Sequence, residues 1–500
     1  MAIEVEDKFD VPPDFEIPDF ADVRGCAEAV SLVSDRLVAL YFDTPDLRLA
    51  AHGITLRRRR GGADAGWHLK LPKAKGVREE ITHPLTRSAK IVPPVLAGLV
   101  HAYTRGRQLV QVAELETVRT VTSLRGADGR PLLEVADDRV KGTVFATVPS
   151  GEDRQVTRWR EVEAELVGGD ADLLRRVGKV LGKAGATPAG TQSKLARLLG
   201  SRIPVPEPAE ADDSTAGRVV VDYVKSQVAA LVAQDPQVRR GGEDAVHQMR
   251  VAGRRLRSAL KSFSGVVAET SGLQDELRWI AGVLGEVRDL EVIRERFAAH
   301  LDTLDPASIV GPVRTRLGDD LAAREREALA RVNEAMSGER YFALLDRLDA
   351  LVASPPLTPL AIKKAAKTLA PVADKGWRRV VKAYDRARAI EDDEQREIAM
   401  HDVRKAAKRA RYTAEALKPL LGDSAADLAK RAKVVQEALG LYQDGVVAQQ
   451  ILFDEAERAR EAGEDTFTYG VLAGIERAAA KRAHAEFPAV WAGLASEGRP

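Results

Sequence analysis

Two patterns of hydrophobic and polar positions divide the chain. Over about the first 200 residues, apolar and polar side chains alternate in short segments, which is the period of a β-strand with one buried face. Beyond residue 214, apolar side chains recur at helical spacing almost to the end. Residues 201–214, SRIPVPEPAEADDS, are rich in proline and acidic residues and indicate a linker. We expect an α+β multidomain protein with domains at 1–200 and 215–495.

The alternating segments predict an antiparallel β domain with a few helices. Turn signals such as Gly61-Gly62 and Asp128-Gly129 separate them. The predicted strands are residues 2–8, 38–42, 55–60, 66–71, 115–124, 132–140 and 159–166.

The helical half contains an internal repeat. Residues 245–263, AVHQMRVAGRRLRSALKSF, match residues 399–417, AMHDVRKAAKRARYTAEAL. LGEVRDLEV at 284–292 matches LGLYQDGVV at 439–447 at nearly the same offset. Two copies of one helical unit, at about 215–350 and 360–495, are the simplest account of these matches. We therefore expect an all-α bundle with a two-fold internal repeat.

Composition limits the location and the chemistry. The net charge of the 500-residue chain is +1, so any anion binding must come from how charges are placed. A single cysteine, Cys26, excludes an internal disulfide and favours a buried, inert thiol. The first ten residues lack the pattern of a signal peptide, and no apolar run approaches the roughly 20 residues of a membrane span. We expect a cytoplasmic protein that does not bind membranes, and the sequence leaves its oligomeric state open.

The predicted strands of the first domain each have an apolar face and a fully charged face. Glu4, Glu6 and Lys8, for example, alternate with apolar residues. The other shared-face sets are Arg57 with Arg59, His68 with Lys70, Arg78 with Glu80, and Glu161 with Glu163 and Glu165. Any single set could be a solvated strand face with cross-strand ion pairs. Together they favour a closed barrel with charges inside, where carboxylates suit Mg²⁺ or Mn²⁺ and the cations suit phosphate.

These segments resemble the CYTH, or triphosphate tunnel metalloenzyme, family. EVEDK at 4–8 matches the ExExK signature of that family. The remaining motifs follow in order: YFDTPDLRLAAHGITLRRRR at 41–60, WHLKLP at 67–72, REE at 78–80, LLEVADDRV at 132–140, WREVEAEL at 159–166 and SKLAR at 193–197. The resemblance implies an eight-stranded antiparallel tunnel that hydrolyses triphosphates or cyclises ATP with Mg²⁺ or Mn²⁺.

The same resemblance implies roles for individual residues. Catalytic residues would be Glu4, Glu6 and Lys8. The metal ligands would be Glu4, Glu6, Asp138, Glu161 and Glu163. The substrate-binding cations would be Lys8, Arg57, Arg59, Lys70, Arg119 and Lys194. Asp138 is preferred to Asp137 because it shares a face with Glu134, and Arg58 and Arg60 are expected at the surface because they alternate with Arg57 and Arg59.

Each helical repeat carries a basic stripe beside its apolar face. In the first repeat the stripe is His247, Arg250, Arg254, Arg257 and Lys261, and in the second it is His401, Arg404, Lys408 and Arg411. A basic helical face is usually a solvated one, in which acidic residues are interleaved with the basic ones. The first stripe has no acidic residue, and like charges in one row are unfavourable unless an anion shares the site. The stripes therefore indicate an anion-binding surface.

These stripes resemble the CHAD family, whose pattern appears as HxxRxxxRRxR at 247–257 and as HxxRxxxKRxR at 401–411. The resemblance implies a two-fold repeated helical bundle with a basic groove that binds polyphosphate. Glu415 stands where the first copy has Lys261, so we expect a lopsided groove. Further groove residues would be Lys363, Lys364, Lys367, Arg378, Arg379 and Lys382.

The leading hypothesis is divalent-metal-dependent hydrolysis of inorganic triphosphate or a related short triphosphate, with polyphosphate bound by the helical domain. Other tunnel activities stay open, namely an adenylate cyclase and a thiamine or nucleoside triphosphatase. A non-catalytic polyphosphate-binding or targeting protein is a further alternative. Binding of nucleic acid is disfavoured because aromatic residues, which would stack on bases, are scarce around both stripes.

Overall fold

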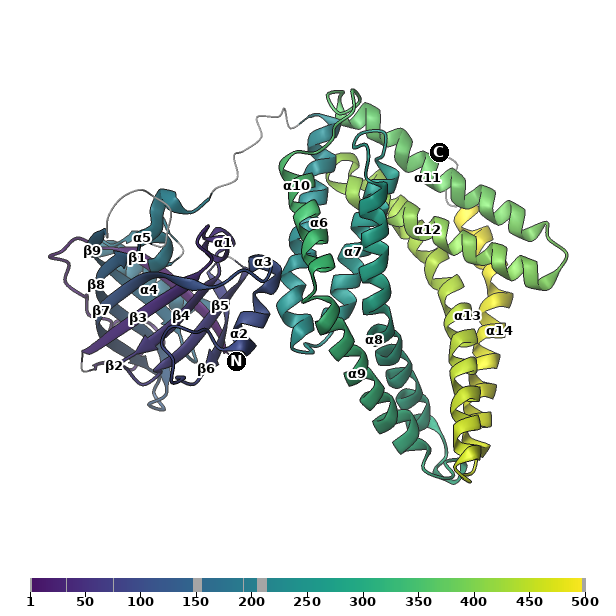
Figure 1. Ribbon diagram of the computed structural model, residues 1–500, viewed down its shortest axis with the longest axis horizontal. Helices are drawn as coiled ribbons and strands as arrows, with labels where there is room; N and C mark the ends of the chain where they lie inside the picture. The colour runs from purple at the N-terminus through teal and green to yellow at the C-terminus, as the bar shows by residue number, and fades with distance from the viewer. Residues whose placement is uncertain are drawn as a thin grey trace. The chain divides into compact units, whose positions relative to one another are not determined.

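A computed structural model describes residues 2–32, 34–74, 76–146, 155–191, 193–204 and 214–496. The chain divides into two compact units, Met1–Glu207 and Pro208–Pro500 (Figure 1). Residues 205–213, which form most of the expected linker, lie outside the described residues. The first unit carries the named strands and the second is helical.

In the described part of the first unit, eight antiparallel strands close into a barrel. They are β1 (Ala2–Asp10), β3 (Asp35–Asp43), β4 (Thr55–Arg60), β5 (Gly66–Ala74), β6 (Val77–His83), β7 (Val110–Arg125), β8 (Pro131–Val144) and β9 (Val156–Leu166). The order around the ring is β1-β6-β5-β4-β3-β7-β8-β9, and β1 also pairs with β9, which closes the ring. The expected eight-stranded antiparallel barrel is confirmed.

Two short strands and several helices surround the barrel. The strands β2 (Glu28–Ser31) and β10 (Thr187–Pro188) pair with β7 and β1. The helices are α1 (Arg48–Ala51), α2 (Pro94–Leu99), α3 (His101–Thr104), α4 (Ala171–Lys183) and α5 (Lys194–Leu199). Ser193 caps α5 by accepting a hydrogen bond from the Ala196 amide at 3.0 Å. The cap fixes the start of α5 and therefore the position of Lys194.

The apolar faces of the strands point away from the barrel axis and are covered by helices. Phe9 and Val162, which are cross-strand neighbours, pack against Val177 of α4. Because side chains alternate along a strand, this leaves the charged residues on the inner face. Cys26 lies beside this core but is only partly buried, and its thiol contacts the Glu28 carbonyl at 3.2 Å, so the expected full burial is wrong.

The second unit consists of two related sets of helices (Figure 1). The first set is α6 (Ala216–Arg239), α7 (Ala245–Ser262), α8 (Ser271–Thr303), α9 (Leu321–Ala335) and α10 (Glu339–Ala353). The second set is α11 (Ala365–Arg388), α12 (Asp393–Leu421), α13 (Asp423–Glu461) and α14 (Phe467–Ser496). The matching sequences fall on α7 and α12 and on α8 and α13, which confirms the expected two-fold repeat. The sets differ after that, because α9 and α10 are two helices where the second set has α14.

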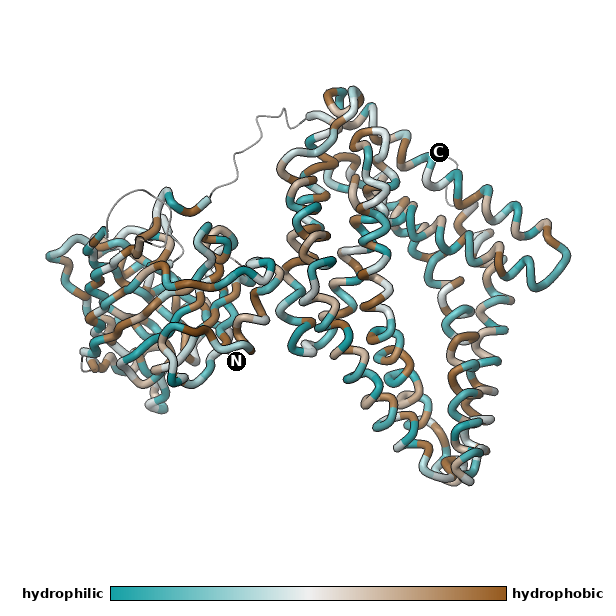
Figure 2. Tube along the Cα trace, viewed as in Figure 1, coloured by the Kyte–Doolittle hydropathy of each residue, from teal (hydrophilic) through white to brown (hydrophobic). Residues whose placement is uncertain are grey.

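None of the helices in the described ranges combines the length and the apolar character that crossing a bilayer requires. Figure 2 shows why, since polar positions recur along each helix between the hydrophobic ones.

A buried ion-pair cluster joins the two helical sets. Glu476 of α14 is fully buried and accepts two hydrogen bonds of 2.5 Å from Arg296 of α8. His300, one turn further along α8, lies 2.9 Å from the same carboxylate. Because a buried charge is costly unless it is paired, each partner depends on the others.

Replacing Glu476 by Ala should lower the free energy of unfolding by about 3–5 kcal/mol, because Arg296 then lacks its buried partner. Glu286→Ala is the matched control, since Glu286 pairs with Arg331 at 2.6 Å on the exposed surface. This substitution should lower the free energy of unfolding by at most about 1 kcal/mol. Urea unfolding followed by far-ultraviolet circular dichroism measures both. Equal effects of the two substitutions would contradict the structural role of the cluster.

Candidate functional site

The inner face of the barrel lines a cavity of about 300 Å³. Nine of the expected site residues line it: Glu4, Glu6, Lys8, Arg57, Arg59, Lys70, Arg119, Glu163 and Lys194. Asp138 and Glu161 lie behind this lining, buried to 0% and 4% exposure, and both contact Lys194. The structure thus brings all eleven tunnel residues into one region.

Closure of the barrel sets the positions of the acidic residues. The β1–β9 register places Glu6 opposite Glu165 and Lys8 opposite Glu163. Lys8 contacts the Glu163 carboxylate and lies 3.0 Å from Glu6. Residues about 155 positions apart in sequence therefore share one stretch of the lumen.

Lys194 is the centre of a buried cluster of charges. Its Nζ lies 2.9 Å from Asp138, 2.8 Å from Glu161 and 2.6 Å from Glu163. Burial would lower the pKa of the Lys194 ammonium, but the three carboxylates hold it above its ordinary value. Burial would likewise raise the pKa of Glu163, and the charges of Lys194 and Lys8 hold it well below its usual range.

Arg119 binds the same carboxylates from β7. Its guanidinium donates to Asp138 at 2.8 and 2.6 Å and to Glu163 at 2.6 Å. Asp137, one residue away, pairs with Arg160 at 2.8 Å on the other face of β8. The alternation of side chains thus puts Asp138, as expected, and not Asp137, on the lumen side.

A second acidic group occupies a different part of the lumen. Glu4 accepts hydrogen bonds from Lys70 at 2.7 and 2.6 Å, yet burial raises the pKa of Glu4. Burial and the neighbouring charge of Glu4 raise the pKa of Glu165 to about 7. Carboxylates therefore outnumber their cationic partners at this point.

The arginines of β4 supply positive charge to the lumen. Burial and the charges of Arg57 and Arg119 lower the pKa of Arg59 to about 9. The Nε atoms of Arg57 and Arg59 are buried and have no hydrogen-bond partner among the described residues. The charges of Arg57, Arg59 and Arg119 in one lumen suit an anion as a further partner. Arg58, on the opposite face of β4, is only 9% exposed, so its expected place at the surface is wrong.

Metal binding has carboxylate ligands of the right type but no preformed cage. Among the described residues, no three acidic, histidine or cysteine side chains converge closely enough to hold a metal ion. The expected ligands fall into two groups, with Glu4 and Glu6 near Glu165, and Asp138, Glu161 and Glu163 around Lys194. The unbalanced charge around Glu4 and Glu165 fits a hard divalent cation, which carboxylate oxygens bind well.

Several lining residues were not assigned from the sequence. The charged and aromatic ones are Tyr41, Asp64, Arg78, Glu80, Glu134 and Glu165. Arg78, Glu80 and Glu165 do show the alternation that reveals lumen-facing positions. Asp64 follows a double-glycine turn, where no periodicity exists to indicate its direction. It contacts Arg59, and its carbonyl lies 2.9 Å from the buried imidazole of His68.

The basic stripes of the helical unit meet between α7 and α12. Burial and the charges of Arg250 and Arg404 lower the pKa of Arg254. Burial and the charges of Arg404 and Arg254 lower the pKa of Lys408 to about 8. A hydroxyl contact of 2.8 Å between Ser262 and Thr413 joins the two helices. Cations from both repeats thus form one cluster, whose mutual repulsion is unfavourable unless an anion offsets it.

The remaining stripe residues have different surroundings. The charges of Arg409 and Arg379 lower the pKa of Lys261, and burial with the charge of Arg278 lowers the pKa of Arg257. Among the additional groove candidates, Arg379 lies near enough to Lys261 to lower its pKa. The candidates are all exposed: Arg379, Lys363, Lys364, Lys367, Arg378 and Lys382.

The second stripe is partly neutralised at its end. Glu415 accepts hydrogen bonds from Arg411 at 2.7 Å and from Arg255 of α7 at 2.9 Å. His247 is partly buried, and burial lowers its pKa. His401 is exposed and contacts the Gln443 amide. The two copies therefore present unequal charges to a shared ligand.

Comparison with known proteins agrees with both halves of this description. A CYTH domain model matches residues 2–198, and a CHAD domain model matches residues 222–452. The chain belongs to the CYTH–CHAD fusion proteins. Two uncharacterized proteins of Mycobacterium tuberculosis, from strains CDC 1551 and H37Rv, are each 41% identical to it over 504 residues, covering 97% of this chain and 95% of the relative.

Solved structures match part of this CYTH–CHAD protein. The CHAD domain from the plant Ricinus communis is 27% identical, with a TM-score of 0.47, and the match covers 58% of this chain and 96% of that one. PptA from Streptomyces chartreusis is 22% identical, also with a TM-score of 0.47, and the match covers 56% of this chain and 99% of that one.

Replacing Lys194 by Met should lower the free energy of unfolding by about 3–5 kcal/mol near pH 8, because three buried carboxylates lose their central cation. Lys194 contributes to the low pKa values of Glu163 and Asp138, and stability from such groups is lost as pH falls through the folded-state pKa. Carboxyl groups ordinarily titrate near pH 4, so the loss should be smaller at about pH 3 than at pH 8. Lys141→Met, which breaks a surface pair with Glu116, is the control. A Lys194 effect that did not depend on pH would contradict the electrostatic origin.

Proposed function

We propose that the CYTH barrel hydrolyses inorganic triphosphate, or a related short triphosphate, with Mg²⁺ or Mn²⁺, and that the CHAD unit binds polyphosphate, both in the cytoplasm. The observation that carries the hydrolytic part is the charge balance of the lumen. Among the described lining residues, seven carboxyl groups face seven lysine and arginine side chains. A neutral lumen of this kind accepts a highly charged anion best when cations enter with it.

The lining residues would act by positioning and by neutralising charge, which is most of what phosphoryl transfer asks of a protein. Arg57 and Arg59 of β4 and Arg119 of β7 would bind phosphate oxygens, and Lys8 and Lys70 would do so beside the carboxylates. Glu4, Glu6, Glu161 and Glu163, with Asp138, would hold the divalent cation. When bound, that cation would supply a lowered pKa of the attacking water and neutralise the phosphate oxygens.

The composition of the cavity favours an inorganic substrate over a nucleotide. Tyr41 is the one aromatic side chain among the described residues that line it. A volume of about 300 Å³ is also at the small end for ligand pockets. A cavity of this size with one aromatic side chain offers little surface on which a nucleotide base could stack. We therefore rank inorganic triphosphate above ATP and thiamine triphosphate as the substrate. An adenylate cyclase activity ranks no higher than hydrolysis of either of those two.

Replacing Glu4 and Glu6 together by Gln should abolish release of phosphate from inorganic triphosphate, because both carboxylates are lost as metal ligands while the size of each side chain is kept. An excess of EDTA should also abolish the activity of the unaltered protein. Added Mg²⁺ or Mn²⁺ should then restore activity to the unaltered protein but not to the double variant. Arg60→Ala, at an exposed outer position of β4, is the control that keeps activity. Full activity in EDTA would overturn the proposal, and no activity on any triphosphate would favour a protein that only binds.

The polyphosphate-binding part rests on the cluster where α7 and α12 meet. Burial and the charges of Arg250 and Arg404 lower the pKa of Arg254, and burial and the charges of Arg404 and Arg254 lower that of Lys408. A chain of phosphates supplies the repeated negative charges that such a row can neutralise. Phosphate contacts of this type weaken with added salt, by analogy with nucleic acids.

Polyphosphate affinity should fall as pH rises from 7 to 9. The pKa of Lys408 is lowered to about 8, so its ammonium loses its charge over this range in the free protein. Lys408→Arg keeps a charge throughout and should remove most of that pH dependence, which also controls for ionisation of the ligand itself. Titration with inorganic polyphosphate at fixed ionic strength measures both proteins. Parallel pH profiles would show that Lys408 does not bind the ligand.

A further inference from the structure

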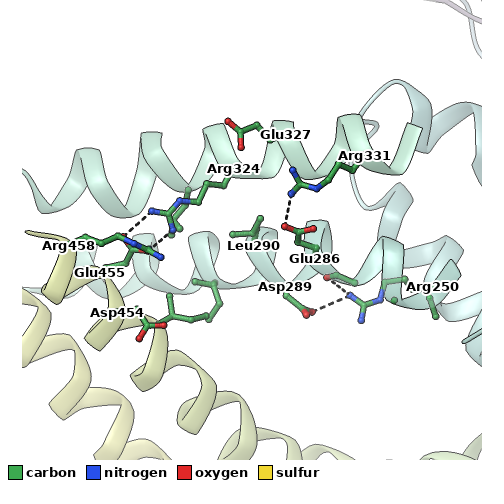
Figure 3. A pocket seen from close by; sticks show the side chains of 16 residues that line it. Arg250, Glu286, Asp289, Leu290, Arg324, Glu327, Arg331, Asp454, Glu455 and Arg458 are labelled. Carbon is green, nitrogen blue, oxygen red and sulfur yellow. Dashed lines mark hydrogen bonds and ion pairs between the residues drawn. The ribbon is translucent and has the colours of Figure 1, made fainter. Parts of the chain in front are cut away.

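Arg250 and Arg404 occupy equivalent positions in the two repeats, and each lies against a glycine of the next long helix. Arg250 donates to the Gly285 carbonyl at 3.0 Å and to Asp289 at 3.2 Å. Figure 3 shows Arg250 directed toward Asp289 at one end of a cavity of about 770 Å³.

The second repeat builds the same contact from different atoms. Arg404 donates to Gln443 at 2.7 Å and lies 3.5 Å from Asp444. Its guanidinium lies over Gly440. Gly440 and Asp444 align with Gly285 and Asp289 in the repeated segments LGLYQDGVV and LGEVRDLEV. An arginine across a glycine, with an aspartate one turn later, thus occurs twice in this chain.

Both glycines are buried inside helices, where glycine is less favourable than alanine. The space that they leave is used by the arginines. A Cβ at position 440 would lie 3.0 Å from Arg404 Nη2 and 3.5 Å from its Cζ. A Cβ at position 285 would lie 3.8 Å from Arg250 Nη2, which is an ordinary contact. Only the second repeat therefore needs glycine for steric reasons at this arginine.

The contact limits where each guanidinium can lie before an anion arrives. Arg250 and Arg404 both belong to the cationic cluster around Arg254 and Lys408. Their aspartate partners are exposed, with 71% and 49% of the side chain accessible, so these ion pairs are weak. A phosphate can then engage an arginine that is already oriented, which reduces the entropy lost on binding.

We propose that Gly440 is a positioning residue for polyphosphate binding: it lets Arg404 of the preceding stripe lie flat against the helix and face the cationic cluster. The inference rests on the proposed binding of polyphosphate by this cluster. It assigns Gly440 a role through Arg404 and none in direct contact with the ligand.

The test uses the full chain and inorganic polyphosphate at several salt concentrations. Gly440→Ala should bind about threefold to tenfold more weakly, the loss expected for one misplaced charge-assisted hydrogen bond. Its salt dependence should be shallower, because fewer phosphate contacts form. The melting temperature should not fall, because alanine favours the helix. Gly282→Ala is the matched control on α8, since an added Cβ there meets nothing within 4 Å.

A double-mutant cycle with Arg404→Ala separates positioning from a general effect on the fold. If Gly440 acts through Arg404, Gly440→Ala should have no further effect on affinity once Arg404 is alanine. An equal loss in both backgrounds, or unchanged affinity in Gly440→Ala alone, overturns the positioning role while polyphosphate binding stands. Absence of polyphosphate binding by the unaltered protein would instead overturn the proposed function, and this inference with it.

Discussion

The pairing of β1 with β9 is the interaction on which the tunnel depends. It closes the sheet, which leaves no open edge between these two strands. It also places Glu6 opposite Glu165 and Lys8 opposite Glu163, so that the first motif of the chain meets the last strand of the barrel. Without closure, each strand would expose a charged face to water, where weak cross-strand pairs are the usual outcome. Closure turns those faces into a shared, enclosed set of charges.

In each unit, some of the cations that we assign to phosphate are paired with carboxylates in the free protein, but the two kinds of pair differ in burial. Lys194 and Arg119 hold carboxylates inside the barrel, where breaking one partner leaves a costly charge. Arg250 and Arg404 pair with exposed aspartates, which water can solvate once they are released. A phosphate can therefore replace a protein carboxylate as the partner of a cation more easily in the helical unit than in the tunnel.

Much of the fold and of the candidate site could be predicted because it depends on local periodicity. Alternation gave the lumen face of Glu4, Arg57 and Lys70, and helical spacing gave both basic stripes. What the sequence could not predict is tertiary. The three carboxylates around Lys194 come from two strands, and their distances follow only from register. The split of the first stripe, with Lys261 facing Arg409 rather than the Arg254 cluster, depends on how the helices cross. Asp64 lies in a turn without any period.

The two sites differ in their balance of charges, and they should therefore differ in whether an anion needs a metal ion in order to bind. The tunnel lining is neutral among the described residues, so a bare triphosphate would bring uncompensated charge into a low-dielectric lumen. Divalent cations that enter with the substrate remove that penalty, and the acidic group at Glu4 and Glu165 gives them ligands. The helical cluster has the opposite excess, because burial and neighbouring arginines lower the pKa values of Arg254 and Lys408. A polyanion alone relieves that repulsion, so the proposed capture of polyphosphate would need no metal, whereas the proposed hydrolysis of triphosphate in the tunnel would.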